Sequence, residues 1–268
     1  MKITSWNINS VRRRIDLIDE INSLVAPDVL CLQECKAQDS DFPLLELKSK
    51  GYDHIVYYGM KAYNGVAICS KYPIIESERM DWVGKSDARH IWADIKAGDK
   101  APIRVHNIYI PAGGDEPNPD VNPKFAHKLQ FVDELAQWSQ QVITQTERQV
   151  ILGDFNIAPS EHDVWNHKQL LKIISHTPQE VELLNYFQQS GAWVDAVRVV
   201  YPEPEKLYSW WSYRSKDWRA SNRGRRLDHI WVTPDLAPQI QSAEIFDIAR
   251  DWAVTSDHCP ISIVLKDV

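Results

Sequence analysis

Residues 149–156 read Gln-Val-Ile-Leu-Gly-Asp-Phe-Asn, an apolar run that stops at a glycine and turns polar at once. Short aliphatic runs bounded in this way are typical of buried β-strands, and we place a strand over 149–152. Residues 123 to about 144, before this strand, carry a mostly apolar stripe at helical spacing, formed by Phe125, Leu129, Val132, Leu135, Ala136, Ser139 and Val142. A strand that follows an amphipathic helix indicates a layered α/β fold.

Eight further strands are predicted by the same signals, at 2–8, 29–33, 54–58, 65–70, 90–96, 103–110, 227–233 and 260–265. A helix capped by Ser10 is predicted over 11–25 and ends before Pro27, and another covers about 179–189 with Gly191 as its stop. Residues 111–123 are rich in proline and glycine and predict an exposed loop, not a domain boundary. We therefore expect a single domain over residues 1–268.

Composition excludes several classes of protein. With 44% hydrophobic and 25% charged residues in 268, the chain is neither disordered, collagen-like nor a coiled coil. No apolar stretch approaches the length of a membrane span, and the first residues lack the apolar region of a secretory signal. We expect a soluble cytoplasmic protein with no membrane partner and a monomeric state. The four cysteines lack metal-binding or redox spacing and are expected to be buried free thiols.

Charge is distributed unevenly along the chain. The net charge is −7, which argues against binding of polyanions by the molecule as a whole. Residues 206–226 nevertheless hold seven Lys or Arg against one Asp, a balance of +6. The sequence therefore predicts one basic face on an acidic body.

Polar residues recur where the predicted strands begin or end. They are Asn7, Glu34, Tyr109, Asp154, Asn156, Asp228, Asp257 and His258. Each one alone fits a turn or cap better than a site. Together, however, several carboxylates that converge at strand ends without matching cations in the sequence imply a bound metal. Carboxylate and amide oxygens suit Mg²⁺ or Mn²⁺ better than Zn²⁺, and Mg²⁺ commonly completes its coordination with phosphate oxygens.

The motifs Ser-Trp-Asn-Ile-Asn, Leu-Gln-Glu, Gly-Asp-Phe-Asn, Asn-Arg-Gly-Arg-Arg-Leu-Asp-His and Ser-Asp-His-Cys-Pro occur in this order. Their order and spacing resemble the exonuclease III type of abasic-site endonuclease over essentially the whole chain. The resemblance implies a four-layered α/β sandwich, with two mixed β-sheets packed face to face and helices on the outer faces. It also implies a hydrolase of DNA repair that cleaves the phosphodiester 5′ to abasic sites, with 3′–5′ exonuclease and 3′-end-cleaning activity.

The resemblance also implies roles for individual residues. Glu34 corresponds to the principal metal ligand, assisted by Asn7 and Asp257, with Mg²⁺ as the cofactor and Mn²⁺ as its substitute. Asp154 corresponds to the carboxylate that orients or deprotonates the attacking water, and Asn156 to the amide that steadies it and the scissile phosphate. Asn9 stands where some relatives have Asp.

Asp228 and His258 match the Asp-His pair of the family. An imidazole with a carboxylate on one nitrogen has a raised pKa and can present a positive donor to a phosphoryl oxygen. His258 is either a general base or such a stabiliser, and we favour the stabiliser because Asp154 then remains free as the base.

Each of these motifs alone is shared with the wider endonuclease/exonuclease/phosphatase superfamily, and Tyr109 separates the branches of that superfamily. A tyrosine in a strand is ordinarily a core residue. In the context Ile-Tyr-Ile-Pro it resembles the tyrosine that contacts the phosphate or leaving oxygen in abasic-site enzymes. His106 cannot replace it, because residues three apart on a strand face opposite sides.

Residues 207–219, Leu-Tyr-Ser-Trp-Trp-Ser-Tyr-Arg-Ser-Lys-Asp-Trp-Arg, interleave five aromatic rings with three cations. Such a segment suits a nucleic acid with an exposed or missing base, and we expect it to contact duplex DNA with abasic sites or blocked 3′ ends. By resemblance, Trp210 is the candidate for the abasic-sugar pocket, and Asn222, Arg223 and Arg89 are candidate DNA contacts. Arg12, in the first turn of the predicted helix over 11–25, opposes the helix dipole unless a DNA phosphate binds there.

Two other functions remain open on sequence alone. One is a phosphomonoesterase of the same superfamily that acts on inositol phosphates or nucleotides, which Tyr109 and the segment 207–226 disfavour. The other is a DNA-binding module without activity. Such a module has no reason to keep four uncompensated carboxylates, which are Glu34, Asp154, Asp228 and Asp257.

Overall fold

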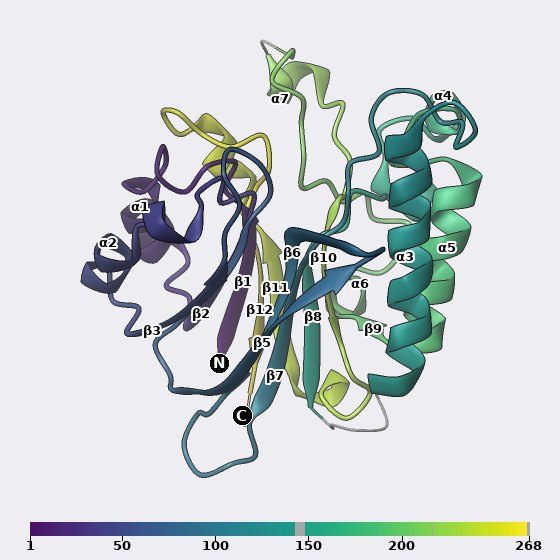
Figure 1. Cartoon of the computed structure of the whole chain (residues 1–268). Coiled ribbons are helices and arrows are strands. Elements are labelled where there is room, and N and C mark those ends of the chain that lie inside the picture. The colour runs from purple at the N-terminus through teal and green to yellow at the C-terminus, as the bar shows by residue number, and fades with distance from the viewer. Residues whose placement is uncertain (143–147, 216, 267–268) are drawn as a thin grey trace.

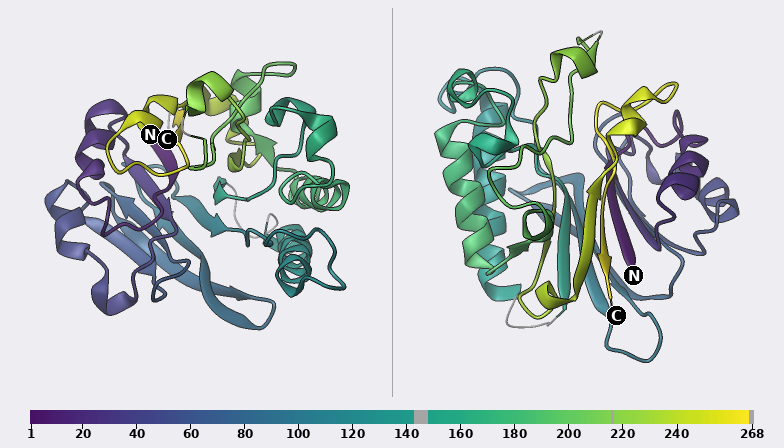
Figure 2. Two further views of the ribbon diagram at one scale, coloured as in Figure 1. Left: turned by 90° about the horizontal axis from the view of Figure 1, so that it is seen from above. Right: turned by 180° about the vertical axis from the view of Figure 1, so that it is seen from behind.

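The computed structural model describes residues 1–142, 148–215 and 217–266. Two six-stranded sheets pack face to face, and helices flank them on both outer sides (Figures 1 and 2). The first sheet has the order β11(Ile240–Ile245), β12(Ile261–Leu265), β1(Lys2–Asn7), β2(Val29–Gln33), β4(Val66–Ser70), β3(His54–Tyr58). The second has the order β5(Ile74–Trp82), β6(Lys85–Ile95), β7(Ile103–Tyr109), β8(Gln149–Asp154), β10(Asp228–Val232), β9(Val194–Asp195). This arrangement confirms the predicted α/β sandwich.

Both sheets are mixed in the same way. β1 pairs with β2, and β7 with β8, in parallel, whereas the other paired strands in both sheets run antiparallel. β1 also pairs with β12, so the first and last strands of the chain lie side by side.

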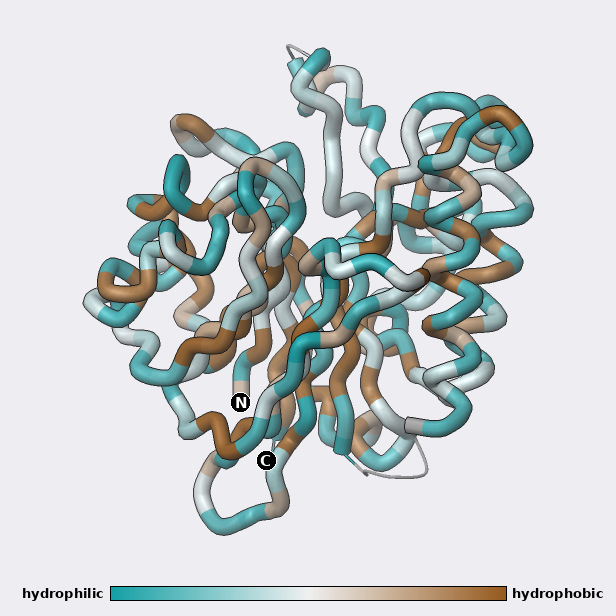
Figure 3. Tube along the Cα trace, viewed as in Figure 1, coloured by the Kyte–Doolittle hydropathy of each residue, from teal (hydrophilic) through white to brown (hydrophobic). Residues whose placement is uncertain are grey.

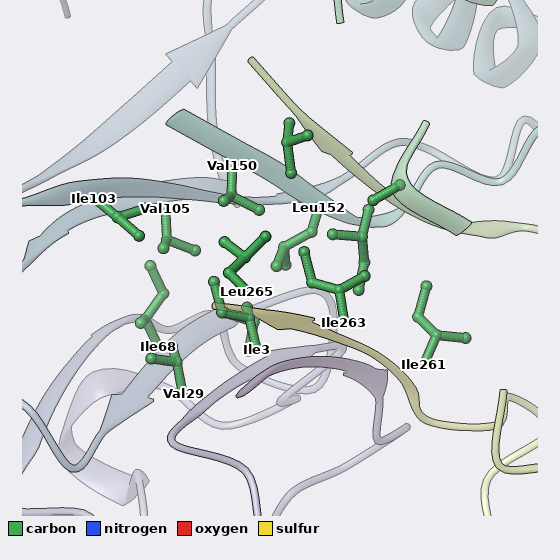
Figure 4. Packing of buried hydrophobic residues seen from close by; sticks show 14 of the residues in the cluster. Ile3, Val29, Ile68, Ile103, Val105, Val150, Leu152, Ile261, Ile263 and Leu265 are labelled. Carbon is green, nitrogen blue, oxygen red and sulfur yellow. The ribbon is translucent and has the colours of Figure 1, made fainter. Parts of the chain in front are cut away.

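Alternation along each strand builds the layers. In β2, Val29 and Cys31 belong to the core between the sheets, whereas Leu30 and Leu32 pack in the cluster under the helices of that side. Figure 4 shows the inter-sheet core, in which residues of both sheets meet, and in Figure 3 the hydrophobic residues follow the strands. All four cysteines are free and buried, as predicted.

The outer faces are covered by four of the helices. α1(Leu17–Leu24) and α2(Leu44–Ser49) cover the first sheet, and α3(Pro123–Val142) and α5(Pro178–Ser190) cover the second. Thr177 and Glu180 form a capping box at the start of α5, and Gly191 ends it as predicted. The shorter elements are η1(Asp39–Asp41), η2(Glu161–Asp163), α4(His167–Leu170), α6(Ala196–Val200), α7(Trp218–Ser221), η3(Ala237–Gln239) and η4(Asp247–Asp251). Within the described chain, no helix is long and apolar enough to span a membrane.

The helix predicted over 11–25 is wrong in its first part. Helix α1 begins only at Leu17, residues 11–16 form turns, and Ser10 has a φ of 88° that does not suit a helix cap. Arg12 is therefore not in the first turn of a helix, and the argument from the helix dipole does not hold for it. The predicted end of the 123–144 helix, together with the side chain of Val142, lies outside the described residues.

Nine predicted strands are present, and β5, β9 and β11 are additional. The ends shift by at most two residues, except that β6 begins five residues before its predicted start at residue 90. Strand β7 ends at Tyr109, β8 at Asp154 and β10 begins at Asp228. The register pairs Tyr109 with Asp154, and Asp154 with Asp228. Because paired residues of neighbouring strands share a face of the sheet, the fold sets these three side chains in one row.

Candidate active site

The row of Tyr109, Asp154 and Asp228 faces the opposite sheet, because Asp154 continues the alternation of Val150 and Leu152 in the inter-sheet core. Asn7, at the end of β1 in that other sheet, reaches across the gap and donates to Asp154 Oδ2 at 2.9 Å. The site thus lies where the two sheets meet at one end of the sandwich, the upper end in Figure 1.

Asp154 is the centre of this cluster. Besides Asn7, the backbone N–H of Asn156 donates to its Oδ1 at 2.9 Å, and the Asn156 side-chain amide donates to its Oδ2 at 3.1 Å. Burial raises the pKa of Asp154 to about 7, although the neighbouring His258 lowers it. A carboxylate that titrates near neutral pH suits the role of a general base.

His258 bridges Asp154 and Asp228. Its Nδ1 donates to Asp228 Oδ2 at 2.8 Å, and its Nε2 lies 3.5 Å from Asp154 Oδ2. Burial lowers the pKa of His258, but the carboxylates of Asp228 and Asp154 outweigh it and raise this pKa to about 10. The imidazole is therefore a buried cation at neutral pH.

Ser209 supports the Asp-His pair. Its hydroxyl donates to Asp228 Oδ2 at 2.6 Å, and it accepts from the backbone N–H of Asp228 at 3.1 Å. This serine is not among the site residues predicted from the sequence, although it stands directly before Trp210.

Glu34 follows β2 and accepts three hydrogen bonds. Asn7 donates to Oε1 at 3.0 Å, the Tyr109 hydroxyl donates to Oε1 at 2.9 Å, and Lys36 Nζ lies 2.6 Å from Oε2. Burial raises the pKa of Glu34, but Lys36 and the Asn7 amide bring it below the usual value. Burial also raises the pKa of Tyr109 far above its usual value, so its hydroxyl stays protonated and donates.

Lys36 corrects the expectation that these carboxylates lack matching cations. Its ammonium also donates to Asn9 Oδ1 at 2.7 Å, and Asn9 Nδ2 donates to Asp257 Oδ1 at 3.2 Å. Lys36 lies only two residues from Glu34, which is the one signal in the sequence that points to this pair.

Asp257 joins the site to the aromatic segment. Its Oδ2 accepts from the indole N–H of Trp210 at 3.0 Å. Burial raises the pKa of Asp257, but His258, Trp210 and Asn9 bring it below the usual value.

The donor set fits a hard divalent cation. Asp154, Asp228 and His258 place one ligand atom each within 4.8 Å of one another, Asn7 donates to Asp154, and Glu34 joins this group through its bond to Asn7. Asp228 Oδ1 is buried and has no hydrogen-bond partner in the part of the chain that the structure describes. Because the imidazole is protonated, the metal-binding atoms on offer are oxygens, which favours Mg²⁺ or Mn²⁺ over Zn²⁺.

Residues 207–219 divide between core and surface. Leu207, Ser209 and Trp211 are buried, Trp210 is half-buried, and Tyr213 is 50% exposed. In Figure 1 the chain rises from the sandwich toward α7, whose first residues, Trp218 and Arg219, end the segment. Half-exposed rings beside the acidic cluster are consistent with stacking on a nucleic acid.

Among the candidate DNA contacts, Arg89 lies against Tyr109 of the cluster, whereas Asn222, Arg223 and Arg12 contact residues outside it. The Arg89 guanidinium lies 4.9 Å from the centre of the Tyr109 ring and is held by Asp87 at 2.5 Å. Asn222 accepts from Trp211 Nε1 at 3.1 Å, and Arg223 is exposed over the Trp165 ring. Arg12 is exposed, with its guanidinium 3.9 Å from Asp41.

The basic surface formed by residues 206–226 is smaller than their net charge of +6 suggests, because several of the cations are buried or paired. Arg226 is buried and paired with Asp163 and Asp195, Arg225 donates to Ser175, and Arg219 pairs with Asp251. Lys216 lies outside the described residues.

The chain is similar to known proteins over almost its whole length. A model of the Endonuclease/Exonuclease/phosphatase family matches residues 4–258. Exodeoxyribonuclease III of Haemophilus influenzae is 32% identical over 269 residues, which cover 97% of this chain and 98% of that protein. An AP endonuclease from Archaeoglobus fulgidus has a similar solved structure, with a TM-score of 0.89, 30% identity and 100% of both chains covered. A 3′ phosphatase from Neisseria, solved with a product DNA hairpin, has a TM-score of 0.90 and 30% identity, with 99% of each chain covered.

Proposed function

The chain belongs to the Endonuclease/Exonuclease/phosphatase family, and we propose that, as a DNA repair nuclease, it hydrolyses the phosphodiester 5′ to abasic sites and trims or unblocks 3′ ends. Relatives named exodeoxyribonuclease III and AP endonuclease support a hydrolase that acts on DNA. One observation in the structure carries the proposal. Trp210 bonds to Asp257 at 3.0 Å and its backbone pairs with His258, so the aromatic segment lies against the acidic cluster.

Asp154 and Asn156 handle the attacking water in this proposal. Asp154, with its pKa raised to about 7 by burial, accepts the proton of the water. Asn156 holds Asp154 through two hydrogen bonds and steadies the water and the scissile phosphate.

His258 is the stabiliser and not the base. Because the neighbouring carboxylates keep it protonated, it can donate to a non-bridging oxygen and offset the charge that grows in the transition state. Asp228 fixes its orientation from the opposite ring nitrogen.

Glu34, Asn7 and Asp257 would hold Mg²⁺, with Mn²⁺ as a substitute. When bound, the ion supplies a positive charge that stabilises the leaving oxygen. The hydroxyl of Tyr109 orients Glu34. In this proposal Tyr109 also lies beside the position at which the scissile phosphate binds. Trp210 lines the pocket for the abasic sugar, and Arg89, Arg12, Asn222 and Arg223 contact the DNA.

Residues 1–268 act as a single domain and a monomer in this proposal. The pairing of β1 with β12 supports one folding unit, because the two ends of the chain complete the same sheet. Light scattering of the purified protein would test the monomeric state.

The function is tested on two substrates side by side. One is a duplex with a single abasic analogue, incubated with Mg²⁺ or with a chelator, and the other is an inositol polyphosphate. We expect Mg²⁺-dependent incision 5′ to the analogue, with a 3′-hydroxyl end and no release of phosphate from the inositol compound. Faster turnover of the inositol polyphosphate would identify a phosphomonoesterase instead.

A further inference from the structure

Side chains from other elements hold the loop that follows β8 by donating hydrogen bonds to its backbone carbonyl groups. Three successive carbonyl oxygens each accept a hydrogen bond from a different side chain. Lys128 Nζ contacts Asn156 O at 2.8 Å, His229 Nε2 contacts Ile157 O at 2.9 Å, and His176 Nδ1 contacts Ala158 O at 2.6 Å. Because a carbonyl oxygen only accepts, His229 carries a proton on Nε2 and His176 carries one on Nδ1.

Lys128 differs from the two histidines because it carries a charge into the core. Its side chain is 0% exposed, and its ammonium lies 2.5 Å from Glu180, whose side chain is also 0% exposed. Lys128 comes from the second turn of α3 and Glu180 from the first turn of α5, so the pair lies between the two outer helices and the site. A buried ion pair contributes little net stability, because the desolvation of both charges offsets their attraction.

Glu180 is fixed independently of Lys128. It accepts from the backbone N–H of Ser175 at 2.9 Å, and from the backbone N–H and the hydroxyl of Thr177 at 3.2 and 2.7 Å. Lys128 also donates to Ala112 O at 3.3 Å, in the loop after β7. Glu180 therefore holds the Lys128 ammonium in place. The ammonium directs its other two hydrogen bonds at the loop after β7 and the loop after β8.

Asn156 is the residue that this donor controls most directly. It has a φ of 53°, a left-handed conformation that asparagine tolerates better than most residues. Its side chain also donates to Ile110 O at 3.0 Å, in addition to its two bonds to Asp154. A shift of the loop at the Asn156 carbonyl would move the Cα of Asn156 and carry its side-chain amide away from both acceptors.

We propose that Lys128, held by Glu180, is a positioning residue that fixes Asn156 against Asp154 through its backbone carbonyl. This inference rests on the proposed function, because it assigns Lys128 to the same hydrolytic site without contact to the substrate. The ion pair thereby couples the outer helices α3 and α5 to the arrangement of the site.

The test is the double variant Lys128→Met/Glu180→Met, which replaces the pair by apolar side chains and leaves no unpaired charge. On a duplex with one abasic analogue, we expect kcat to fall at least tenfold and KM to change less than threefold. In an Asn156→Ala background, the same double substitution should lower kcat less than twofold, because the group that it positions is absent. If the double variant does not fold, the single variant Lys128→Gln replaces it in the same assay. In that variant Glu180 still accepts from the backbone N–H groups of Ser175 and Thr177 and from the Thr177 hydroxyl.

Arg104→Met/Asp94→Asn is the matched control. This partly buried ion pair, at 2.8 Å, lies at the far ends of β6 and β7, and its loss should change stability but leave kcat within twofold. The inference is overturned if the Lys128 variants keep the kcat of a parent that cleaves the duplex, or if they lose as much in the Asn156→Ala background. Failure of the parent to cleave abasic DNA at all contradicts the proposed function itself.

Discussion

The indole N–H of Trp210 donates to the carboxylate of Asp257 at 3.0 Å, across 47 residues of chain. The next residue, Trp211, donates its backbone N–H to Asp257 O at 3.0 Å. These bonds fasten the aromatic segment to the loop that carries His258. The aromatic segment and the acidic cluster are therefore joined directly, and the ring of Trp210 is held beside the cluster.

Trp210→Ala should weaken the binding of abasic DNA. Stacking on an aromatic ring contributes about 1–3 kcal/mol per base, which corresponds to roughly a 5- to 150-fold increase in Kd. Trp210→Phe keeps a ring and loses only the bond to Asp257, so its Kd should rise much less. Fluorescence anisotropy with a labelled duplex measures both values, and equal affinities of the Ala variant and the parent would rule out this pocket.

Asp228→Asn should shift the alkaline limb of the pH–rate profile. With Asp228 and Asp154 beside it, the pKa of His258 is raised to about 10, so the required imidazolium is present below that pH and lost above it. Removing the Asp228 charge lowers this pKa, and the loss of activity should begin at least about one pH unit lower. A profile of kcat from pH 6 to 10.5 that keeps the same alkaline limb in the variant would contradict the role of His258 as a charged stabiliser.

Tyr109→Phe should lower kcat about tenfold or more, because Glu34 loses the hydroxyl donor at 2.9 Å that orients it. Tyr52→Phe is a matched control, since Tyr52 is also buried and its hydroxyl donates to Asn22 at 2.7 Å, away from the site. The control should lose stability in urea unfolding but keep its kcat. Equal kcat values for the two variants would show that the Tyr109 hydroxyl has no part in the reaction.

Stability should fall as the pH drops below about 6.5. Burial keeps three histidines neutral in the folded protein: it lowers the pKa of His106 to about 3, that of His229 to about 4 and that of His90 far below its usual value. The unfolded chain takes up these protons at its ordinary pKa of about 6.5, so each histidine lowers the free energy of unfolding by about 1.4 kcal/mol per pH unit below it.

Urea unfolding at pH 7.5, 6 and 5 measures this slope. The variant His106→Gln, which lacks one of the three buried imidazoles, should show a shallower slope than the parent. A free energy of unfolding that is the same at pH 7.5 and pH 5 would contradict the assignment of neutral buried histidines.

The strands that the sequence predicts are those with an apolar side chain on at least one face. Strand β5 was missed because Ile75, Glu76, Ser77, Glu78 and Arg79 in its middle are all exposed, so it has no buried face to leave a pattern. In β9 the strand has only two residues, too few for alternation to be visible.

The start of α1 shows a tertiary contact overriding a local pattern. The periodicity of Val11, Ile15 and Ile18 indicates a helix, but Arg14 is drawn toward the site. Its guanidinium donates to Val254 O at 2.7 Å and Thr255 O at 2.9 Å. These bonds tie the turns of residues 11–16 to the loop before Asp257, and the helix begins only afterwards.

The acidic members of the site were visible in the sequence because a carboxylate at the end of an apolar strand is unusual. The cations were not visible in the sequence, because Lys36 and Arg226 have the pattern of ordinary surface charges. Only the fold shows which carboxylate each of them contacts. Lys36 contacts Glu34, and Arg226 is buried against Asp163. Charge counted along a segment therefore overstated the basic surface over 206–226.

The central claim is that Asp154 activates water beside a bound phosphodiester, and Asp154→Asn tests it most directly. The substitution keeps the size of the side chain and removes the base, so the variant should bind an abasic duplex within about threefold of the parent Kd. Its single-turnover cleavage rate with Mg²⁺ should fall at least about 100-fold, the lower end of what a general base contributes. Cleavage by Asp154→Asn at the rate of the parent would contradict the account.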